Sequence, residues 1–205
     1  LRGPIARAFG DQLPQALAWG VGIGIFGFVL AAVSRTFSDE LVKSFPTFAD
    51  LIKTIFPGVD LTSAGWFLQL IFVEMGLIVT GFAAATFVGK WASDEGSGRL
   101  EMLLTAPLTP RRWAIAGGVG ALLAIALTTV MYALAIGLGG AVGGSEVVTP
   151  MVGTVALGLY AAAMVGVGVA IGGLWRTSLA AELVAAVVIV TFLVNLLAPA
   201  LQLPD

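Results

Sequence analysis

The stretch from Pro14 to Val33 reads PQALAWGVGIGIFGFVLAAV and contains no charged residue. Twenty residues in an α-helix span about 30 Å, which is the thickness of the hydrocarbon core of a bilayer. Four further apolar runs of this kind follow, at about 64–89, 113–140, 151–174 and 179–198, with Glu74 in the second and Glu182 early in the fifth. The sequence therefore predicts an all-α polytopic membrane protein, with five spans in a single transmembrane domain over residues 1–205.

The composition supports this class and excludes others. Hydrophobic residues make up 59% of the 205 positions, and the mean hydropathy is +1.03, well above the usual value for a soluble domain. The chain has 10 Lys and Arg against 12 Asp and Glu, so it lacks the basic character of a nucleic-acid binder. It has no Cys and no His, which excludes disulfides, thiol and imidazole catalysis and zinc sites built on these residues. No metal site is expected, and no phosphate-binding loop of the Gly-x-x-x-x-Gly-Lys-Ser/Thr type is present, so we do not expect an enzyme.

Basic residues in the connections predict the orientation. With a cytoplasmic N-terminus, seven basic residues lie inside and three lie outside. The inner seven are Arg2, Arg7, Lys90, Arg99, Arg111, Arg112 and Arg176, and the outer three are Arg35, Lys43 and Lys53. We therefore expect a multi-pass protein of the plasma membrane with its N-terminus inside. Because residue 1 is Leu and no signal sequence opens the chain, we expect it to be part of a longer polypeptide.

Two amphipathic segments are predicted to lie on the membrane surface. Residues 1–12 carry an apolar face and are too short to span, which is typical of an interfacial helix. Residues 39–56 form the second candidate, with Ser38 as its cap. Thr109-Pro110 and Thr149-Pro150 are typical helix starts, and the Gly-x-x-x-Gly pairs, including Gly139 and Gly143, predict close helix packing. The tryptophans, Trp91 and Trp113 among them, are interpreted as interfacial anchors.

The longest inward connection, residues 90–113, carries the most specific signal. A short helix over about 98–106 follows the flexible Gly96-Ser97-Gly98, and Pro107 ends it. Leu100, Leu103 and Leu104 fall on one face of this helix. Such a helix suits either docking to a cytoplasmic partner or burial of its leucines in the headgroup layer, and the pattern alone does not choose between them.

The run Asp94-Glu95-Gly96-Ser97-Gly98-Arg99-Leu100-Glu101-Met102-Leu103-Leu104-Thr105-Ala106-Pro107 resembles the signature between the second and third spans of ABC-2 type exporter permeases, also called type V exporters. The continuation Leu108-Thr109-Pro110-Arg111-Arg112-Trp113 is similar to the tetronasin-resistance type of multidrug permease. The layout of the remaining chain agrees with this resemblance. One departure is that a family half has six spans, and tetronasin-type permeases fuse two halves, so we expect most of one half, preferably the second.

The resemblance implies a coupling helix that inserts into a separate ATPase subunit. Polar contacts with that subunit would come from Asp94, Glu95, Arg99 and Glu101, apolar packing from Leu100, Leu103 and Leu104, and Pro107 would end the helix. ATP and magnesium would be bound by the partner ATPase and no cofactor by this chain. The expected partners are ABC ATPase subunits, a second permease half or copy, membrane lipid and a hydrophobic or amphiphilic substrate such as a drug.

Glu74 is the candidate residue of the substrate path. A carboxylate at the bilayer centre costs about 2.5–3.5 kcal/mol on insertion scales, so it should face a wet cavity, bind a partner group or be protonated. It would either attract cationic drugs or hydrogen-bond to a neighbouring span. Two functions from other classes stay open: a secondary, ion-coupled transporter that uses Glu74, and a membrane scaffold subunit whose inner helix only recruits a partner.

Overall fold

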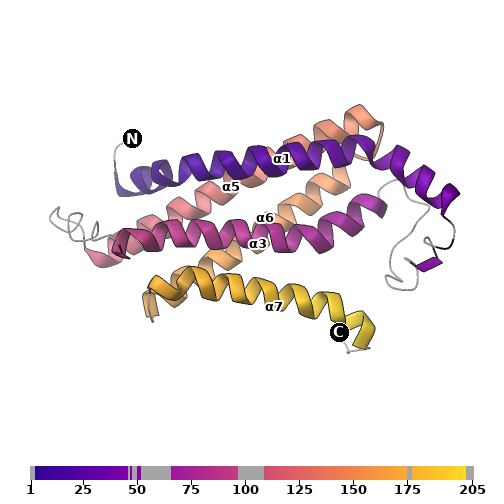
Figure 1. Ribbon diagram of the computed structural model, residues 1–205. Coiled ribbons are helices and arrows are strands. Elements are labelled where there is room, and N and C mark those ends of the chain that lie inside the picture. The colour runs from indigo at the N-terminus through magenta and orange to yellow at the C-terminus, as the bar shows by residue number, and fades with distance from the viewer. Residues whose placement is uncertain are drawn as a thin grey trace.

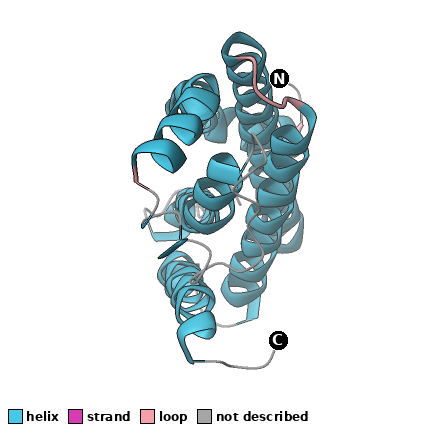
Figure 2. Ribbon diagram, turned by 90° about the vertical axis from the view of Figure 1, so that its right-hand side faces the viewer, coloured by secondary structure: helices cyan, strands magenta, loops and turns pink. Residues whose placement is uncertain are grey.

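The computed structural model describes residues 3–45, 47, 50–51, 66–96, 109–174 and 177–201. All regular structure in these residues is helical (Figure 2). The elements are α1 (Pro4–Ser44), α3 (Trp66–Gly96), α5 (Pro110–Gly143), α6 (Val148–Leu174), the 3-10 turn η1 (Thr177–Leu179) and α7 (Ala180–Leu201). The predicted fold class is therefore confirmed.

Four of these helices are long and apolar enough to cross a membrane. The membrane-compatible segments are Pro4–Leu41, Met75–Ser93, Arg111–Gly143 and Val148–Leu174. Helix α7 has 22 residues, about 33 Å at 1.5 Å per residue, and its described apolar part covers Ala180–Asn195. Each of the five predicted spans thus falls on its own helix, and α7 has the shortest apolar part.

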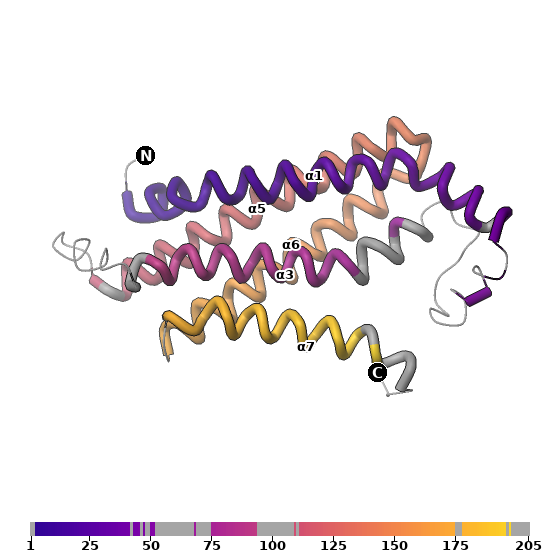
Figure 3. The backbone as a smooth tube through the Cα atoms, in the orientation of Figure 1, coloured from indigo at the N-terminus to yellow at the C-terminus, as the bar shows by residue number. Residues whose placement is uncertain are grey.

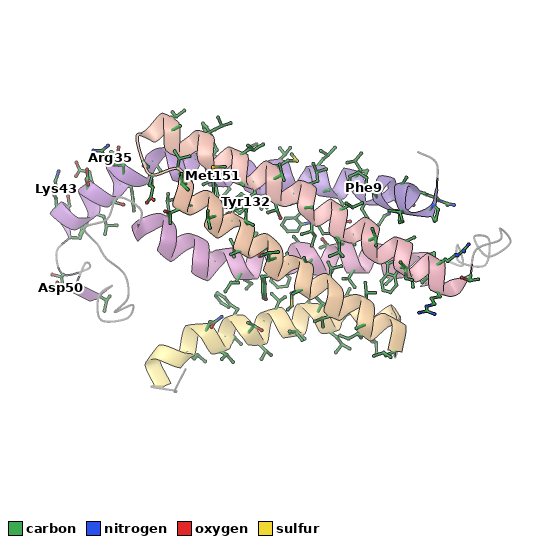
Figure 4. All side chains as sticks on the ribbon, turned by 180° about the vertical axis from the view of Figure 1, so that it is seen from behind. Phe9, Arg35, Lys43, Asp50, Tyr132 and Met151 are labelled. Carbon is green, nitrogen blue, oxygen red and sulfur yellow. The ribbon has the colours of Figure 1, made fainter. Side chains whose placement is uncertain are left out.

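The helices form an up-and-down bundle. Helices α1, α3 and α7 lie in front in Figure 1, with α5 and α6 behind them, and the reverse view of Figure 4 agrees. Helix α1 packs along most of α5, and α3 packs mainly on α6 and α7. Direct packing between α1 and α3 is much less extensive. The bundle therefore contains a tight α1–α5 pair, with α6 packed on both α5 and α3 to a similar extent and α7 packed mainly on α3.

Small residues explain how closely α1 and α5 approach. A Cβ added to Gly139 would overlap the carbonyl oxygen of Phe28, and one added to Gly143 would overlap that of Ala32. In a bilayer, where lipid tails compete with apolar side chains, close backbone contact is a main source of helix association. Helix α5 ends at Gly144 with φ 64°, a left-handed conformation that favours glycine.

Helix α1 differs from the prediction at both ends. Residues 4–12, expected as a separate interfacial helix, continue through Pro14 into the first span as one helix (Figure 3). A proline inside a helix costs about 3 kcal/mol, but tertiary contacts hold both sides of Pro14, because Gln12 hydrogen-bonds to α3 before it and the Ala16 carbonyl accepts from Thr128 of α5 after it. Leu1 and Arg2 lie outside the described residues.

The second predicted interfacial helix, 39–56, does not begin at Ser38. Ser38 is buried inside α1, which continues to Ser44, because no helix-breaking residue separates Val33 from Ser44. Most of the remaining segment, residues 46, 48–49 and 52–56, lies outside the described residues. Helix α6 also begins earlier than expected, at Val148 rather than after a Thr149 cap, and the Thr149 hydroxyl donates to Glu146.

Candidate functional site

The ends of α3 and α5 position the segment that the sequence singles out. Asp94 and Glu95 lie in the last turn of α3, although their side chains lie outside the described part of the chain. Helix α5 begins as predicted, with Pro110 in its first turn and the Thr109 hydroxyl accepting a hydrogen bond from the Arg112 N–H at 3.3 Å. The other predicted coupling residues lie outside the described residues. These are Arg99, Leu100, Glu101, Leu103, Leu104 and Pro107.

Two tryptophans join the helix ends on either side of this segment. The rings of Trp91 in α3 and Trp113 in α5 stack, with centroids 5.3 Å apart and planes at 23°. Trp91 is only 4% exposed, and a Cβ on Gly117 would overlap its indole ring. The interpretation of Trp91 as an anchor at the membrane surface is therefore wrong, because its ring fills the space between two helices.

Described lysine and arginine side chains are more numerous at this end of the bundle than at the other. Of the charged side chains that the structure describes, four basic and two acidic ones lie where α1, α5 and α7 begin and α3 ends; they are Arg7, Asp11, Lys90, Arg111, Arg112 and Glu182. Arg7 and Asp11 form an exposed pair at 4.0 Å. The opposite end has two basic and four acidic residues, which are Arg35, Asp39, Glu40, Lys43, Asp50 and Glu146 (Figure 4). This charge asymmetry separates the two ends of the described helices.

A small cavity lies in the middle of the bundle, between the α1–α5 pair and the group of α3 and α6. It has room for about one water molecule. Its lining comes from four helices: Ile23, Thr80, Ala83, Phe87, Ile125, Thr128, Thr129, Tyr132, Thr154, Gly158 and Ala161. Five of these side chains carry hydroxyl groups.

The threonine hydroxyls around this cavity bond to backbone carbonyls. Thr80 donates to Gly76 at 2.7 Å, Thr129 to Ile125 at 2.8 Å and Thr154 to Pro150 at 2.9 Å. The Thr128 hydroxyl lies 3.0 Å from the carbonyl of Ala124 and 3.2 Å from that of Ala16 in α1. The cavity surface is consequently mostly apolar, and sequence reasoning missed it, because threonines scattered over three spans give no sign that they converge.

A second polar cluster, also missed, connects α1 with α3. Gln12 Nε2 donates to the Phe87 carbonyl at 3.0 Å. Gln15 Nε2 and Trp19 Nε1 both donate to Thr86 Oγ1, at 2.6 and 3.0 Å, and that hydroxyl donates to the Ala83 carbonyl at 2.7 Å. We call Gln12, Gln15, Trp19, Thr86 and Phe87 the α1–α3 seam. Gln12 and Gln15 were the sequence signal that could have revealed this cluster, because they are uncharged polar residues at the start of an apolar run.

The two intramembrane glutamates have different outcomes. Glu74 belongs to α3, but its side chain lies outside the described residues, so its role in the substrate path stays a prediction. Glu182 is exposed in the first turn of α7, in line with its place near the membrane surface. Among the described residues, no group of three acidic side chains gathers to hold a metal ion.

A family model described as "Multidrug efflux system permease Rv1217c, C-terminal domain" matches residues 1–205. This chain belongs to that family. No curated protein and no solved structure matches the chain.

Membership of this permease family agrees with the helices described above. The long apolar helices and the family together make the chain a multi-pass membrane protein. It is a membrane permease domain of the drug-efflux class. The Trp91–Trp113 pair, the central cavity and the α1–α3 seam are the features of this permease on which a mechanism can be built.

Proposed function

We propose that this permease domain is the transmembrane part of an ATP-driven exporter of the ABC-2 type, similar to the tetronasin-resistance permeases. A separate ATPase subunit, which binds ATP and magnesium, would dock on residues 94–107. In this proposal Leu100, Leu103 and Leu104 pack into the ATPase, and Asp94, Glu95, Arg99 and Glu101 make polar contacts with it. Pro107 ends the coupling helix before α5 begins.

The Trp91–Trp113 stack is the observation that carries the proposal. A coupling segment can transmit force only if the helices at its two ends respond together. The stack, at 5.3 Å between centroids, connects the last turns of α3 to the first turn of α5, and aromatic pairs of this kind contribute about 0.5–1.5 kcal/mol beyond their burial. A push on the segment would therefore move both helices, with α1 following α5 through their close packing.

The charge asymmetry supports a cytoplasmic location for this end. Lysine and arginine residues flank the spans on the cytoplasmic side of membrane proteins, and four described basic side chains lie at the α3–α5 end against two at the opposite end. The N-terminal end of α1 lies at the same end (Figure 1). We infer that the N-terminus and the ATPase are both cytoplasmic and that the membrane is the plasma membrane.

The substrates in this proposal are hydrophobic or amphiphilic drugs. The family description, a multidrug efflux system permease, supports this class. It also names a C-terminal domain, in keeping with a second half. A second permease half or copy would complete the translocation path, with membrane lipid covering the remaining apolar faces.

ATP hydrolysis in lipid nanodiscs tests the proposal. The transporter, purified with its native neighbours, is compared with the double variant Glu101→Lys, Leu103→Asp. The expected result is co-purification of an ATPase whose turnover falls at least tenfold in the variant. The matched control carries the same two types of change, Glu182→Lys and Leu179→Asp, at the start of α7. Both residues are exposed and lie at the same end of the bundle as the connection between α3 and α5.

Each outcome has a distinct meaning. Loss of turnover in the coupling variant but not in the control supports the ABC exporter. If an ATPase still co-purifies and its turnover is unchanged, residues 94–107 are not the coupling segment. If no ATPase associates and an ion gradient alone drives transport, the secondary transporter replaces this proposal, with Glu74 as its coupling carboxylate.

A further inference from the structure

Three side-chain hydrogen bonds join α1 to α3 across the seam, where the direct contact between the two helices is otherwise small. The larger α1–α5 interface also has hydrogen bonds, such as that from Thr128 to the Ala16 carbonyl, but its glycines bring the two backbones into direct contact. Helix α3 packs on α6 and α7 through contacts such as Gly76 with Leu157 and Gly81 with Val188. Hydrogen bonds between membrane helices average only about 0.6 kcal/mol. A molecule that offers equivalent polar groups can therefore replace them at little cost.

The seam also reaches from the surface toward the central cavity. Thr86 is exposed on α3 although it lies within an apolar span. Phe87, whose carbonyl accepts from Gln12, and Ala83, whose carbonyl accepts from Thr86, both line the cavity. Opening the seam would thus extend the cavity to the bilayer between α1 and α3.

One group in the seam indicates the chemistry of an occupant. Gln12 is 3% exposed, and its Oε1 atom has no hydrogen-bond partner among the residues that the structure describes. A buried acceptor left without a donor costs about 1–3 kcal/mol. The nearby Thr86 hydroxyl already accepts two hydrogen bonds and donates one, the full capacity of a hydroxyl. The available group is therefore an acceptor, and it favours a molecule that carries an N–H or O–H donor.

We propose that the α1–α3 seam is a lateral access site through which an amphiphile bearing hydrogen-bond donors passes from the bilayer into the central cavity. This inference rests on the proposed export function and names its access route and substrate class. Gln12 Oε1 accepts from the amphiphile, and Gln15, Trp19 and Thr86 exchange their mutual hydrogen bonds for bonds to it. Opening separates α1 from α3 at the seam.

Reversible cross-linking tests whether the seam must open. Gln15→Cys with Thr86→Cys introduces two thiols into a chain that has no cysteine of its own, and a short bis-methanethiosulfonate joins them. The control, Ser34→Cys with Ser145→Cys, joins α1 to the end of α5, where the two hydroxyl oxygens lie 2.9 Å apart. We expect cross-linking of the seam pair to lower ATP-driven export of rhodamine 6G at least tenfold relative to the same variant before cross-linking, with return to that level after reduction by dithiothreitol. Cross-linking of the control pair should leave its own export unchanged. Full export by the cross-linked seam pair overturns the proposal.

Two related dyes test the role of Gln12. Rhodamine 6G carries N–H groups, and tetramethylrhodamine ethyl ester has a similar size and charge but no N–H. Gln12→Met keeps the side-chain volume and removes both the Oε1 acceptor and the Nε2 donor to the Phe87 carbonyl. We expect about tenfold lower apparent affinity for rhodamine 6G, with the ester unaffected. Equal changes for both dyes contradict the assigned acceptor.

A binding measurement separates this inference from the proposed function. In the transporter with the single variant Thr86→Cys, saturating rhodamine 6G should slow maleimide labelling at least threefold without any nucleotide. Unchanged labelling contradicts the seam even if ATP-driven export by the wild type is intact. If ATP-driven export is absent but rhodamine 6G clearly slows labelling of the Thr86→Cys variant, the ABC exporter is contradicted and the seam is retained as a binding site.

Discussion

Gly143 of α5 lies directly against the carbonyl oxygen of Ala32 in α1, so that a Cβ at this glycine would overlap the oxygen. One turn earlier, Gly139 meets the Phe28 carbonyl in the same way. The two contacts keep the α1–α5 pair together near the acidic end of the bundle. Backbone atoms cannot rotate aside as a side chain can, so this interface has little tolerance for added volume.

We predict that Gly143→Ala destabilises the domain by about 1–3 kcal/mol, the usual cost of overpacking. The matched control is Gly166→Ala in α6, where an added Cβ meets nothing within 4 Å and where alanine is the better helix former. Thermal unfolding in detergent micelles, monitored by size-exclusion chromatography, measures the stability of both variants. Equal unfolding temperatures for the two variants would show that α1 and α5 are not in this close contact.

Removing the Thr109 hydroxyl should loosen the start of α5. Thr109→Ala loses the acceptor for the Arg112 N–H, and an N-cap of this kind contributes about 1 kcal/mol. Hydrogen exchange of the amides at residues 111–113 should become about fivefold faster, while exchange in the middle of α5 stays unchanged. Thr109→Ser keeps a hydroxyl and should exchange like the wild type; if it exchanges as fast as the alanine variant, the capping hydrogen bond is absent.

A substitution in the Trp91–Trp113 pair should weaken coupling to the ATPase without preventing its assembly with the permease. We predict that Trp113→Ala leaves the ATPase bound but reduces drug-stimulated ATP hydrolysis by about fivefold, corresponding to about 1 kcal/mol of lost stacking. Trp113→Phe retains an aromatic ring and should keep most of the stimulation. Nanodisc assays of nucleotide turnover with and without drug provide the measurement. Stimulation at the wild-type level in the alanine variant would remove the stack from the coupling mechanism.

Glu74→Gln tests the one acidic residue predicted in the substrate path. It should reduce export of cationic drugs about tenfold, or about 1.4 kcal/mol, and leave neutral drugs nearly unaffected, because only cations gain from the carboxylate. Transport of a cationic and a neutral dye in the same proteoliposomes makes the comparison. Equal loss for both dyes would favour a packing or hydrogen-bonding role. No loss for either dye would show that Glu74 has no role in the substrate path.

Parts of the structure followed from local sequence alone. Charge-free runs such as Pro14–Val33 predicted membrane helices, because a buried charge in a bilayer is costly and an apolar run of 20 residues has few alternatives. The start of α5 at Pro110 was also predicted, because the Thr109 cap acts within one turn. The packing role of Gly139 and Gly143 was expected from their spacing, although not which helix they would meet.

Other features were decided only by tertiary contacts. The continuity of α1 through Pro14 depends on Phe87 and Thr128, which lie more than 70 residues away. The stacking of Trp91 on Trp113 depends on how α3 and α5 converge, and so does the gathering of Thr80, Thr128 and Thr154 around one cavity. The hydrophobic pattern of a membrane helix fixes that it crosses the bilayer but leaves its rotation and its neighbours open, because lipid and protein are equally apolar. The sequence by itself thus determined the spans and the class of protein, whereas close contacts and hydrogen bonds between helices decided which residues form the Trp91–Trp113 stack, the cavity and the α1–α3 seam.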